Sequence, residues 1–294
     1  MKKILLTGVS GYLGSRVIQE IISRNFDIKF DFVLYFRKSF SCQFSKNVSS
    51  IYGEHNLEEF LNNNQIDMVI HFATSYEENS ISDVNIDFPI FIISRILQNQ
   101  NDIDFINIDT FLSCAERTVN KYSESKKIFK TKARLLEKNN SNFNFINIVV
   151  HQIFGDGDKD YKFLSKTISD IHKSEAQIEL TCGEQARYFT FIDDVIKNII
   201  KIIIQYINDD SATYSGNLID HHIVSNETST LMDFLITVKS AFSSKTSLNF
   251  CKLPYRRHEI MFPIFDKDTL NIKHICKTSI NEALKLMDKR MKEN

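Results

Sequence analysis

The sequence predicts an α/β protein in which a doubly wound parallel sheet is joined by a smaller, mixed α/β lobe late in the chain. Three observations support this fold class. Short apolar runs alternate with amphipathic stretches through residues 1–150, as in repeated β-α units. A glycine-rich segment directly follows the first apolar run. After residue 155, shorter strand patterns are mixed with helical ones.

The strands of the first half are expected where short apolar runs occur. These runs are Ile4–Leu6, Phe32–Phe36, Met68–Phe72, Phe105–Ile108 and Phe145–Val150. Helices are expected between them, where apolar residues recur at helical spacing. They are Tyr12–Ser23, Leu57–Asn63, Val84–Gln98 and Lys121–Lys138. This order of elements is that of a doubly wound sheet.

The turn-rich segment from Phe154 to Asp158 is interpreted as a junction. It divides the chain into residues 1–155 and 156–294, with some later segments expected to return to the core of the first part. Short strands are expected at Tyr188–Ile192, Asn217–Ile219, Ser247–Phe250 and Glu259–Phe262, and helices at Val195–Tyr206, Leu231–Phe242 and Ile280–Met291. The last helix begins with a capping-box pattern, Ser279 followed by Glu282.

The composition limits the possible partners. With 36 basic and 37 acidic residues the net charge is −1, so no overall field attracts nucleic acid or an acidic membrane. No signal-peptide pattern and no stretch of transmembrane length is found, so a cytoplasmic protein is expected. The cysteines are odd in number and widely spaced, which predicts no disulfide framework, no metal site and a reducing compartment. They are Cys42, Cys114, Cys182, Cys251 and Cys276.

The glycine-rich segment predicts a dinucleotide site. Gly8, Gly11 and Gly14 lie between a predicted strand and a predicted helix. In that position they supply a tight turn, a close approach to a pyrophosphate at a helix N-terminus, and close helix–strand packing. The predicted cofactor contacts of this segment are Gly8, Ser10, Gly11, Tyr12, Leu13 and Gly14. The first part of the chain is therefore predicted to be a Rossmann domain.

The end of the second predicted strand indicates which nicotinamide cofactor is used. An acidic residue there would bind the ribose 2′-hydroxyl of NAD, and a basic one would bind the 2′-phosphate of NADP. The run ends with Arg37 and Lys38 and contains no acid, whereas Asp31 lies too early. We therefore expect NADPH, with Arg37 as the main phosphate partner and NADH still possible. The alternative is a solvated basic loop.

Tyr122 and Lys126 are four residues apart and therefore share one face of the predicted helix. A nearby ammonium stabilises a phenolate and lowers its pKa, so Tyr122 can exchange a proton with a substrate oxygen during hydride transfer. A third group is expected at the end of the preceding strand. Thr110 is the first choice and Ser113 its competitor. For His71, also at a strand end, a structural hydrogen bond is expected rather than catalysis.

The motifs resemble those of the extended short-chain dehydrogenase/reductases that modify nucleotide sugars. The segments that carry the resemblance are Thr7–Gly14, His71–Thr74, Tyr122 with Lys126, and Arg187–Asp194. Within that family, residues 107–111, 183–187 and 256–262 resemble the branch of CDP-abequose and CDP-paratose synthases, which reduce the 4-keto group of a CDP-3,6-dideoxyhexose with NADPH.

The resemblance implies that Thr110, Tyr122 and Lys126 form a catalytic triad. It implies a nucleotide-diphosphate sugar as substrate and a homodimer as the assembly. Its remaining site residues are Phe72, Ala73, Thr74, Tyr122 and Lys126 toward the cofactor, and Thr110, His151, Gln152, Arg187 and Arg256 toward the substrate, with Arg257 as an alternative to Arg256.

Other functions are considered beside this one. Phe111 and Leu112 stand where a 4,6-dehydratase has an Asp-Glu pair, which disfavours dehydration. An NAD-dependent 4-epimerase is the second choice, disfavoured by Arg37. An NADP-sensing regulator without catalysis is a third possibility, disfavoured because Tyr122 and Lys126 are both present. The tyrosine after Arg187 departs from the Arg-Asp pattern of many relatives.

Overall fold

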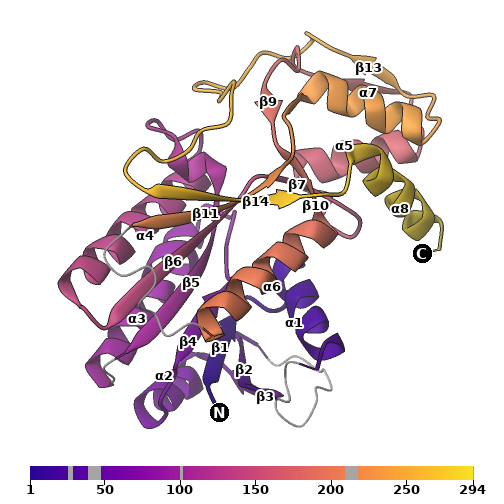
Figure 1. Cartoon of the computed structure of the whole chain (residues 1–294). Helices are drawn as coiled ribbons and strands as arrows, with labels where there is room; N and C mark the ends of the chain where they lie inside the picture. The colour runs from indigo at the N-terminus through magenta and orange to yellow at the C-terminus, as the bar shows by residue number, and fades with distance from the viewer. Residues whose placement is uncertain (26–28, 39–47, 100–101, 209–217, 294) are drawn as a thin grey trace.

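Eight parallel strands form one continuous sheet through the middle of the molecule (Figure 1). The computed structural model describes residues 1–25, 29–38, 48–99, 102–208 and 218–293. The strands of the sheet are β1 (Lys3–Thr7), β2 (Asp31–Phe36), β3 (Val48–Tyr52), β4 (Met68–His71), β5 (Ile103–Thr110), β6 (Phe143–Val150), β11 (Ile219–Ser225) and β14 (Leu270–Cys276). Their order across the sheet is β14-β11-β6-β5-β4-β1-β2-β3. This confirms the predicted doubly wound parallel sheet.

Helices cover both faces of the sheet, because successive residues of each strand point to opposite sides. Ile4 and Leu6 pack into one core with α1 (Tyr12–Ser23) and α6 (Ile192–Asn208). Leu5, between them, packs into the other core, whose helices are α2 (Glu54–Asn63), α3 (Phe88–Asn99) and α4 (Lys121–Asn139). A π-helical turn, η2 (Asp83–Asp87), precedes α3, and a 3-10 turn, η3 (Phe111–Cys114), follows β5.

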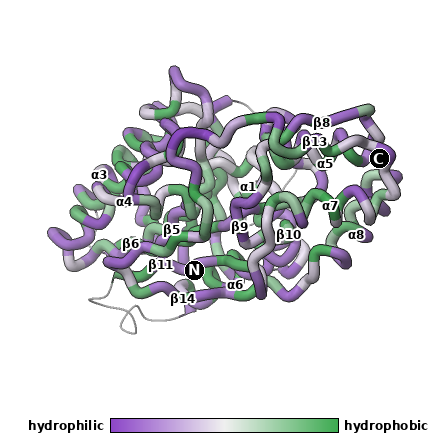
Figure 2. The backbone as a smooth tube through the Cα atoms, turned by 90° about the horizontal axis from the view of Figure 1, so that it is seen from above, coloured by the Kyte–Doolittle hydropathy of each residue, from purple (hydrophilic) through white to green (hydrophobic). Residues whose placement is uncertain are grey.

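A smaller lobe lies at the end of the molecule opposite α3 and α4 (Figure 2). Its helices are α5 (Phe163–His172), α7 (Leu231–Ala241) and α8 (Ile280–Glu293). Its short strands pair as β7 (Gln152–Phe154) with β10 (Phe189–Phe191), β8 (Gln177–Glu179) with β13 (Ser247–Asn249), and β9 (Ala186–Arg187) with β12 (Ser229–Thr230). The rings of Phe189 and Phe234 stack at 3.9 Å and join β10 to α7.

The chain passes between the two parts several times. β11 and β14, from the second half, complete the sheet beside β6, and α6 packs against α1. A charged cluster fixes α8 to the junction: Arg290 contacts Asp156 at 3.0 Å and Asp193 at 2.7 Å. The boundary at residue 155 stays a prediction.

All five strands and all four helices predicted in the first half are present, although the third helix begins as the π-helical turn. In the second half the predicted helices are confirmed, and both hydrogen bonds of the Ser279 and Glu282 capping box form. The strand at Glu259–Phe262 was predicted wrongly, because that segment has no strand structure. The helix α5 and the strands β3, β7, β8, β9, β12 and β14 were not predicted, and of β11 only Ile219 lies within a predicted strand. Asn217, the start of another predicted strand, lies outside the described residues.

A disulfide joins Cys182 to Cys251, which corrects the expectation of no disulfide and removes the cysteine argument for a reducing compartment. The two cysteines are 69 residues apart in the sequence. They follow the paired strands β8 and β13, and this pairing brings their Cα atoms to 4.1 Å. Spacing along the chain cannot reveal a pairing that the fold creates. Cys42 lies outside the described residues.

Within the described ranges, no helix combines the length and the apolar character needed to cross a lipid bilayer.

Candidate active site

A cleft of about 1010 Å³ lies between the carboxyl ends of the sheet strands and the smaller lobe. Nearly all the predicted site residues line it. They are Gly8, Ser10, Gly11, Tyr12, Leu13, Gly14, Arg37, Phe72, Ala73, Thr74, Thr110, Tyr122, His151, Gln152, Arg187 and Arg256. Lys126 is 2% exposed and lies behind the cleft wall, and Arg257 does not line the cleft. The fold thus brings the predicted cofactor contacts and the predicted substrate contacts to one cleft.

The glycine loop connects β1 to α1. Gly8 has φ +72°, and a Cβ at this position would lie 2.2 Å from the backbone nitrogen of Ala73, so only glycine fits between the loops after β1 and β4. Gly14 allows equally close packing, since its Cβ would lie 2.5 Å from the Gly8 carbonyl oxygen. Gly11 is the N-cap of α1, and no side chain caps the helix there. The first residues of α1 line the cleft, and no capping side chain accepts from the N–H groups at this end of the helix.

Two side chains of opposite charge line the cleft near the end of β2. Arg37 follows β2 and is exposed, as the sequence predicts. Glu54, from the first turn of α2, lines the same cleft and was not considered at the level of sequence. Only the fold shows that Glu54 lies near the end of β2, because Glu54 follows β3, a strand that was not predicted.

Tyr122 lies at the start of α4, where Asn120 caps the helix through a hydrogen bond from Ser123 N of 2.8 Å. Its ring packs on the ring of Tyr76 at 4.4 Å. Burial raises the pKa of the Tyr122 hydroxyl well above its usual value, Tyr76 raises it further, and a hydrogen bond with Thr74 lowers it. The expectation that Lys126 lowers the pKa of this phenol is therefore wrong, because burial is the largest influence on it and raises its pKa.

Lys126 has its own pKa lowered by burial, and the carboxylate of Asp109 opposes this shift. None of the hydrogen bonds and ion pairs found among the described residues involves its ammonium group.

Thr110, and not Ser113, faces the cleft. Thr110 ends β5, and its Oγ1 accepts a hydrogen bond of 3.4 Å from Leu112 N. The Ser113 hydroxyl is buried and donates to Asp109 Oδ2 at 2.8 Å. His71 is also buried, with its Nδ1 2.7 Å from Thr7 Oγ1, and burial lowers its pKa well below the usual value. This geometry supports the structural role expected for His71.

Another part of the cleft lining comes from β7, β9 and the loop that follows Cys251. The guanidinium of Arg187 forms an ion pair of 2.7 Å with Glu259 and lies over the ring of Phe111. Arg256 is exposed at the rim. His151 stacks on Phe111 at 5.3 Å. Arg187 therefore offers a guanidinium that is already held in place, whereas Arg256 is exposed to solvent.

Three further residues at the site were missed by sequence reasoning. Tyr76 packs on Tyr122, and the ammonium of Lys162 lies 5.5 Å from the centre of the Tyr76 ring. Asn85, in the π-helical turn, accepts from Ser75 N at 2.7 Å and donates to Ser125 Oγ at 2.9 Å, so it links the loop after β4 to α4. An asparagine inside an apolar helical stretch is the one signal that could have indicated this role.

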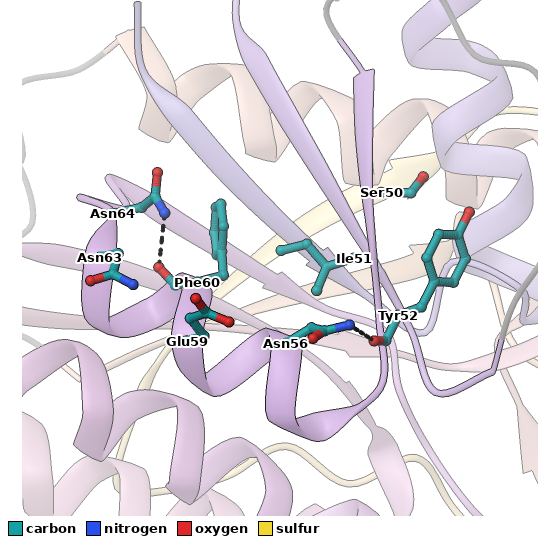
Figure 3. A pocket seen from close by; sticks show the side chains of 8 residues that line it. All are labelled: Ser50, Ile51, Tyr52, Asn56, Glu59, Phe60, Asn63 and Asn64. Atoms are coloured by element: carbon teal, nitrogen blue, oxygen red, sulfur yellow. Dashed lines mark hydrogen bonds between the residues drawn. The ribbon is translucent and has the colours of Figure 1, made fainter.

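A cluster of possible metal ligands and a second hollow contain none of the predicted catalytic residues. Cys114, Asp220 and His222 have ligand atoms within 4.8 Å of one another, but Lys130 and Arg134 contact both carboxylate oxygens of Asp220, so we assign no metal there. A hollow of about 380 Å³ lies between β3 and α2 (Figure 3). Its Asn56 and Asn64 amides donate to the nearby carbonyl groups of Tyr52 and Phe60, and no predicted site residue lines it.

Comparison with known proteins gives a consistent result. Residues 4–88 and 98–214 match the model of the NAD dependent epimerase/dehydratase family. A CDP-abequose synthase of Yersinia pseudotuberculosis is 27% identical over 284 residues, covering 92% of this chain and 94% of that protein. A CDP-abequose synthase of Salmonella typhimurium is 25% identical over 214 residues, covering 69% and 68%.

Solved structures share the fold. A UDP-glucose 4-epimerase of Thermotoga maritima with UDP-glucose aligns with a TM-score of 0.76 and 15% identity, over 99% of both chains. A dTDP-glucose 4,6-dehydratase of Bacillus anthracis in complex with NAD aligns with a TM-score of 0.75 and 13% identity, over 100% of this chain and 97% of the other. The family model covers more than half of the sequence, so the chain belongs to the NAD dependent epimerase/dehydratase family.

Proposed function

We propose that this protein uses NADPH to reduce the C4 keto group of a nucleotide-activated hexose. The substrate is a CDP-linked 6-deoxy or 3,6-dideoxy sugar, made for an O-antigen or another polysaccharide. As a family member the chain is an NAD(P)-dependent nucleotide-sugar oxidoreductase. One observation carries the finer proposal: Thr110 and Tyr122 face the same cleft as the glycine loop, in a chain similar to CDP-abequose synthases.

The residues present fit a dinucleotide. The uncapped N–H groups of α1, in the tight loop that Gly8 permits, suit a pyrophosphate, and Arg37 suits a 2′-phosphate. Lys126 is a buried ammonium to which the described residues offer no hydrogen bond, and a ribose hydroxyl would supply an acceptor. When bound, the cofactor supplies the hydride.

The roles of the chain's own groups follow from their positions. Thr110 donates a hydrogen bond to the C4 oxygen, and Tyr122 gives that oxygen its proton. The high pKa of Tyr122 suits this direction of reaction, because the phenol stays protonated until the substrate oxygen becomes basic. Lys126 then stabilises the phenolate. Arg187 and Arg256 bind the diphosphate, and His151 and Gln152 lie toward the sugar.

One observation favours a second candidate, an NAD-dependent 4-epimerase. Glu54 lines the cleft with Arg37, and a carboxylate at that end suits a ribose 2′-hydroxyl. The epimerase would hold NAD through purification and would need no external NADPH.

The decisive experiment follows NADPH absorbance with CDP-4-keto-3,6-dideoxyglucose and with CDP-, dTDP- and GDP-4-keto-6-deoxy sugars. We expect steady oxidation with a CDP-linked substrate that Tyr122→Phe lacks. Bound NAD in the purified protein and no oxidation with any substrate would favour the epimerase. NADPH binding without either reaction would identify a cofactor-sensing protein.

The assembly and setting are part of the same proposal. We expect a homodimer, which light scattering measures, and a cytoplasmic location, which cell fractionation measures. We also propose that residues 1–155 bind the cofactor and that residues 156–294 mainly bind the nucleotide sugar.

A further inference from the structure

Asp109 directly precedes Thr110 at the end of β5 and is 3% exposed. Its Oδ1 accepts a hydrogen bond from Thr110 N at 2.7 Å. Its Oδ2 accepts from Ser113 Oγ at 2.8 Å and from Asn147 Nδ2 at 3.2 Å. Three donors therefore hold the carboxylate in one orientation. Burial raises the pKa of Asp109, and the charges of Lys126 and Lys130 and the hydrogen bonds from Thr110 and Ser113 oppose this rise.

The other buried charges behind the site are already paired. Lys130 contacts Asp220 at 2.5 Å and Asp266 at 2.6 Å. Arg134 contacts Asp220 at 3.2 Å and Glu137 at 2.9 Å. Lys126, one turn before Lys130 on the same helix, has no ion pair within 4 Å in the described part of the chain.

The titratable groups that face Asp109 or Lys126 come from four elements other than β5. They are Tyr122 and Lys130 on α4, Cys114 on η3, His71 on β4 and Asp220 on β11. Burial raises the pKa of the Cys114 thiol to about 12 and that of Tyr122 well above its usual value, and it lowers that of His71. These three groups are neutral near pH 7, and Lys130 and Asp220 contact each other. The Asn147 amide donates to Asp109 Oδ2 at 3.2 Å and to Asp220 Oδ1 at 3.0 Å, and Asp220 is held by Lys130, one turn after Lys126 on α4. Asp109 therefore lies beside the face of α4 that carries both lysines, and its carboxylate opposes the loss of the Lys126 proton.

We infer that Asp109 is a positioning residue that keeps Lys126 charged and at the same time fixes the backbone of Thr110. A buried ammonium without a counter-charge tends to lose its proton. A neutral Lys126 could no longer stabilise the phenolate of Tyr122. The Asp109 side chain thus sets the charge of Lys126 and the backbone position of Thr110, two members of the proposed triad, without touching the substrate. The inference rests on the proposed function only for the role of Lys126.

The test measures the charge of Lys126 directly and needs no substrate. Protein labelled with [ε-¹³C]lysine is titrated by NMR, and the Lys126 signal is assigned by its absence in Lys126→Arg. In Asp109→Asn we expect the pKa of Lys126 to fall by at least about one pH unit, as for removal of a nearby opposite charge. The matched control, Asp266→Asn, removes a carboxylate that pairs with Lys130 and should leave Lys126 unchanged. Equal Lys126 titrations in Asp109→Asn and wild type would overturn the inference.

A second measurement covers the case in which Asp109→Asn folds poorly. We expect the double variant Asp109→Asn, Lys126→Met to melt at a higher temperature than Asp109→Asn alone, because no uncompensated charge remains. A double variant that melts lower than Asp109→Asn would contradict the pairing. If Lys126 titrates as expected but no keto sugar is reduced, the proposed function fails and the inference about Asp109 stands.

Discussion

At Gly8, the backbone of a neighbouring loop leaves no room for any side chain. Its positive φ alone is a strain that other residues tolerate at some cost, and positive φ also occurs at Gly53. The difference lies in the surroundings. Nothing lies within 4 Å of a Cβ at Gly53, whereas at Gly8 the Cβ meets backbone atoms of Phe72 and Ala73. The loops after β1 and β4 can approach one another only through this glycine.

We therefore expect Gly8→Ala to destabilise the protein by roughly 3 kcal/mol or more, since backbone must move as well as twist. The matched change Gly53→Ala, at φ 82° and ψ 156° with open space around the Cβ, should cost less, roughly 1–3 kcal/mol for the backbone conformation alone. Urea unfolding measures both. Fluorescence titration with NADPH should show weakened binding for Gly8→Ala alone. Equal losses of stability in the two variants would contradict the steric explanation.

The proposed preference for NADPH can be tested at Arg37 and Glu54. We expect Arg37→Ala to raise the KM for NADPH by roughly tenfold or more, the value of a charge-assisted phosphate contact, and to leave that for NADH unchanged. Glu54→Gln should weaken NADH binding more than NADPH binding. Steady-state kinetics, or titration of the free protein with each cofactor, measures both effects. Arg37→Ala with equal losses for the two cofactors would show that Arg37 does not read the 2′-phosphate.

For single residues, the sequence can predict a role in the site where that role depends on local geometry. Gly8 and Gly14 follow from a strand–turn–helix pattern, and Tyr122 and Lys126 follow from helical spacing. Tyr76 and Asn85 could not be predicted, because their roles depend on contacts with α4 that only the fold creates. The high pKa of Tyr122 has the same origin, since it depends on burial by distant residues.

At the scale of elements, β11 is an internal strand, paired on both sides, that carries polar side chains. Asp220, His221 and His222 are each no more than 1% exposed. Each has buried partners: Asp220 accepts from Lys130, His221 lies 2.7 Å from the Tyr206 hydroxyl, and His222 lies 3.2 Å from His151. Because buried polar groups must find partners, these residues fit a strand only where its neighbours supply them.

This strand makes stability sensitive to acid. Burial lowers the pKa of His221 and His222 to about 4 and that of His151 to about 3. Above pH 6.5 these histidines are neutral in both states, and below it the unfolded chain binds protons that the folded protein does not. We expect the free energy of unfolding to fall between pH 6.5 and pH 4, by up to about 2 kcal/mol per histidine at pH 5.

Urea unfolding at pH 7.5 and pH 5 measures the loss. In His221→Gln the loss should be smaller than in wild type, because one titrating group is removed. The exposed His55 provides the control, and His55→Gln should show the wild-type difference. An unfolding energy that is the same at both pH values would contradict neutral, buried histidines.

The polar residues of β11 also explain why the sequence predicted so little of it. An apolar run identifies β1, β4 or β6, but Asp-His-His interrupts that pattern in β11. The edge strand β14 alternates without a buried face, since most of its side chains are partly or fully exposed. The segment Glu259–Phe262 shows the reverse error. Its residues suit a strand, yet Glu259 is used in the ion pair with Arg187.

At the scale of the molecule, the disulfide fastens the lobe beside the cleft. After Cys251, the backbone nitrogens of Lys252 and Leu253 donate to the Leu180 carbonyl at 3.0 and 3.1 Å. This loop continues to Arg256 at the rim. The covalent link therefore closes a long segment of the lobe just before the chain reaches the proposed substrate residues.

We expect Cys182→Ser, or reduction with dithiothreitol, to lower the unfolding free energy by up to about 4 kcal/mol, from the chain entropy of a 69-residue separation. Thermal melting with and without reductant measures this. Cofactor binding should stay unchanged, because the glycine loop lies in the other part of the molecule. The control is the reductant on Cys182→Ser, where no further loss is expected. A reductant effect of wild-type size in that variant would contradict the assignment.

The late return of the chain to the sheet has a consequence for its synthesis. A nascent chain that has left the ribosome only as far as β6 carries a hydrophobic strand with an unpaired edge, together with Lys130 and Arg134 on α4 but without Asp220. Such edges pair readily with other chains. The sheet can close only after β11 and then β14 have emerged. A premature stop codon before residue 219 would therefore yield an aggregating fragment rather than a small cofactor-binding domain.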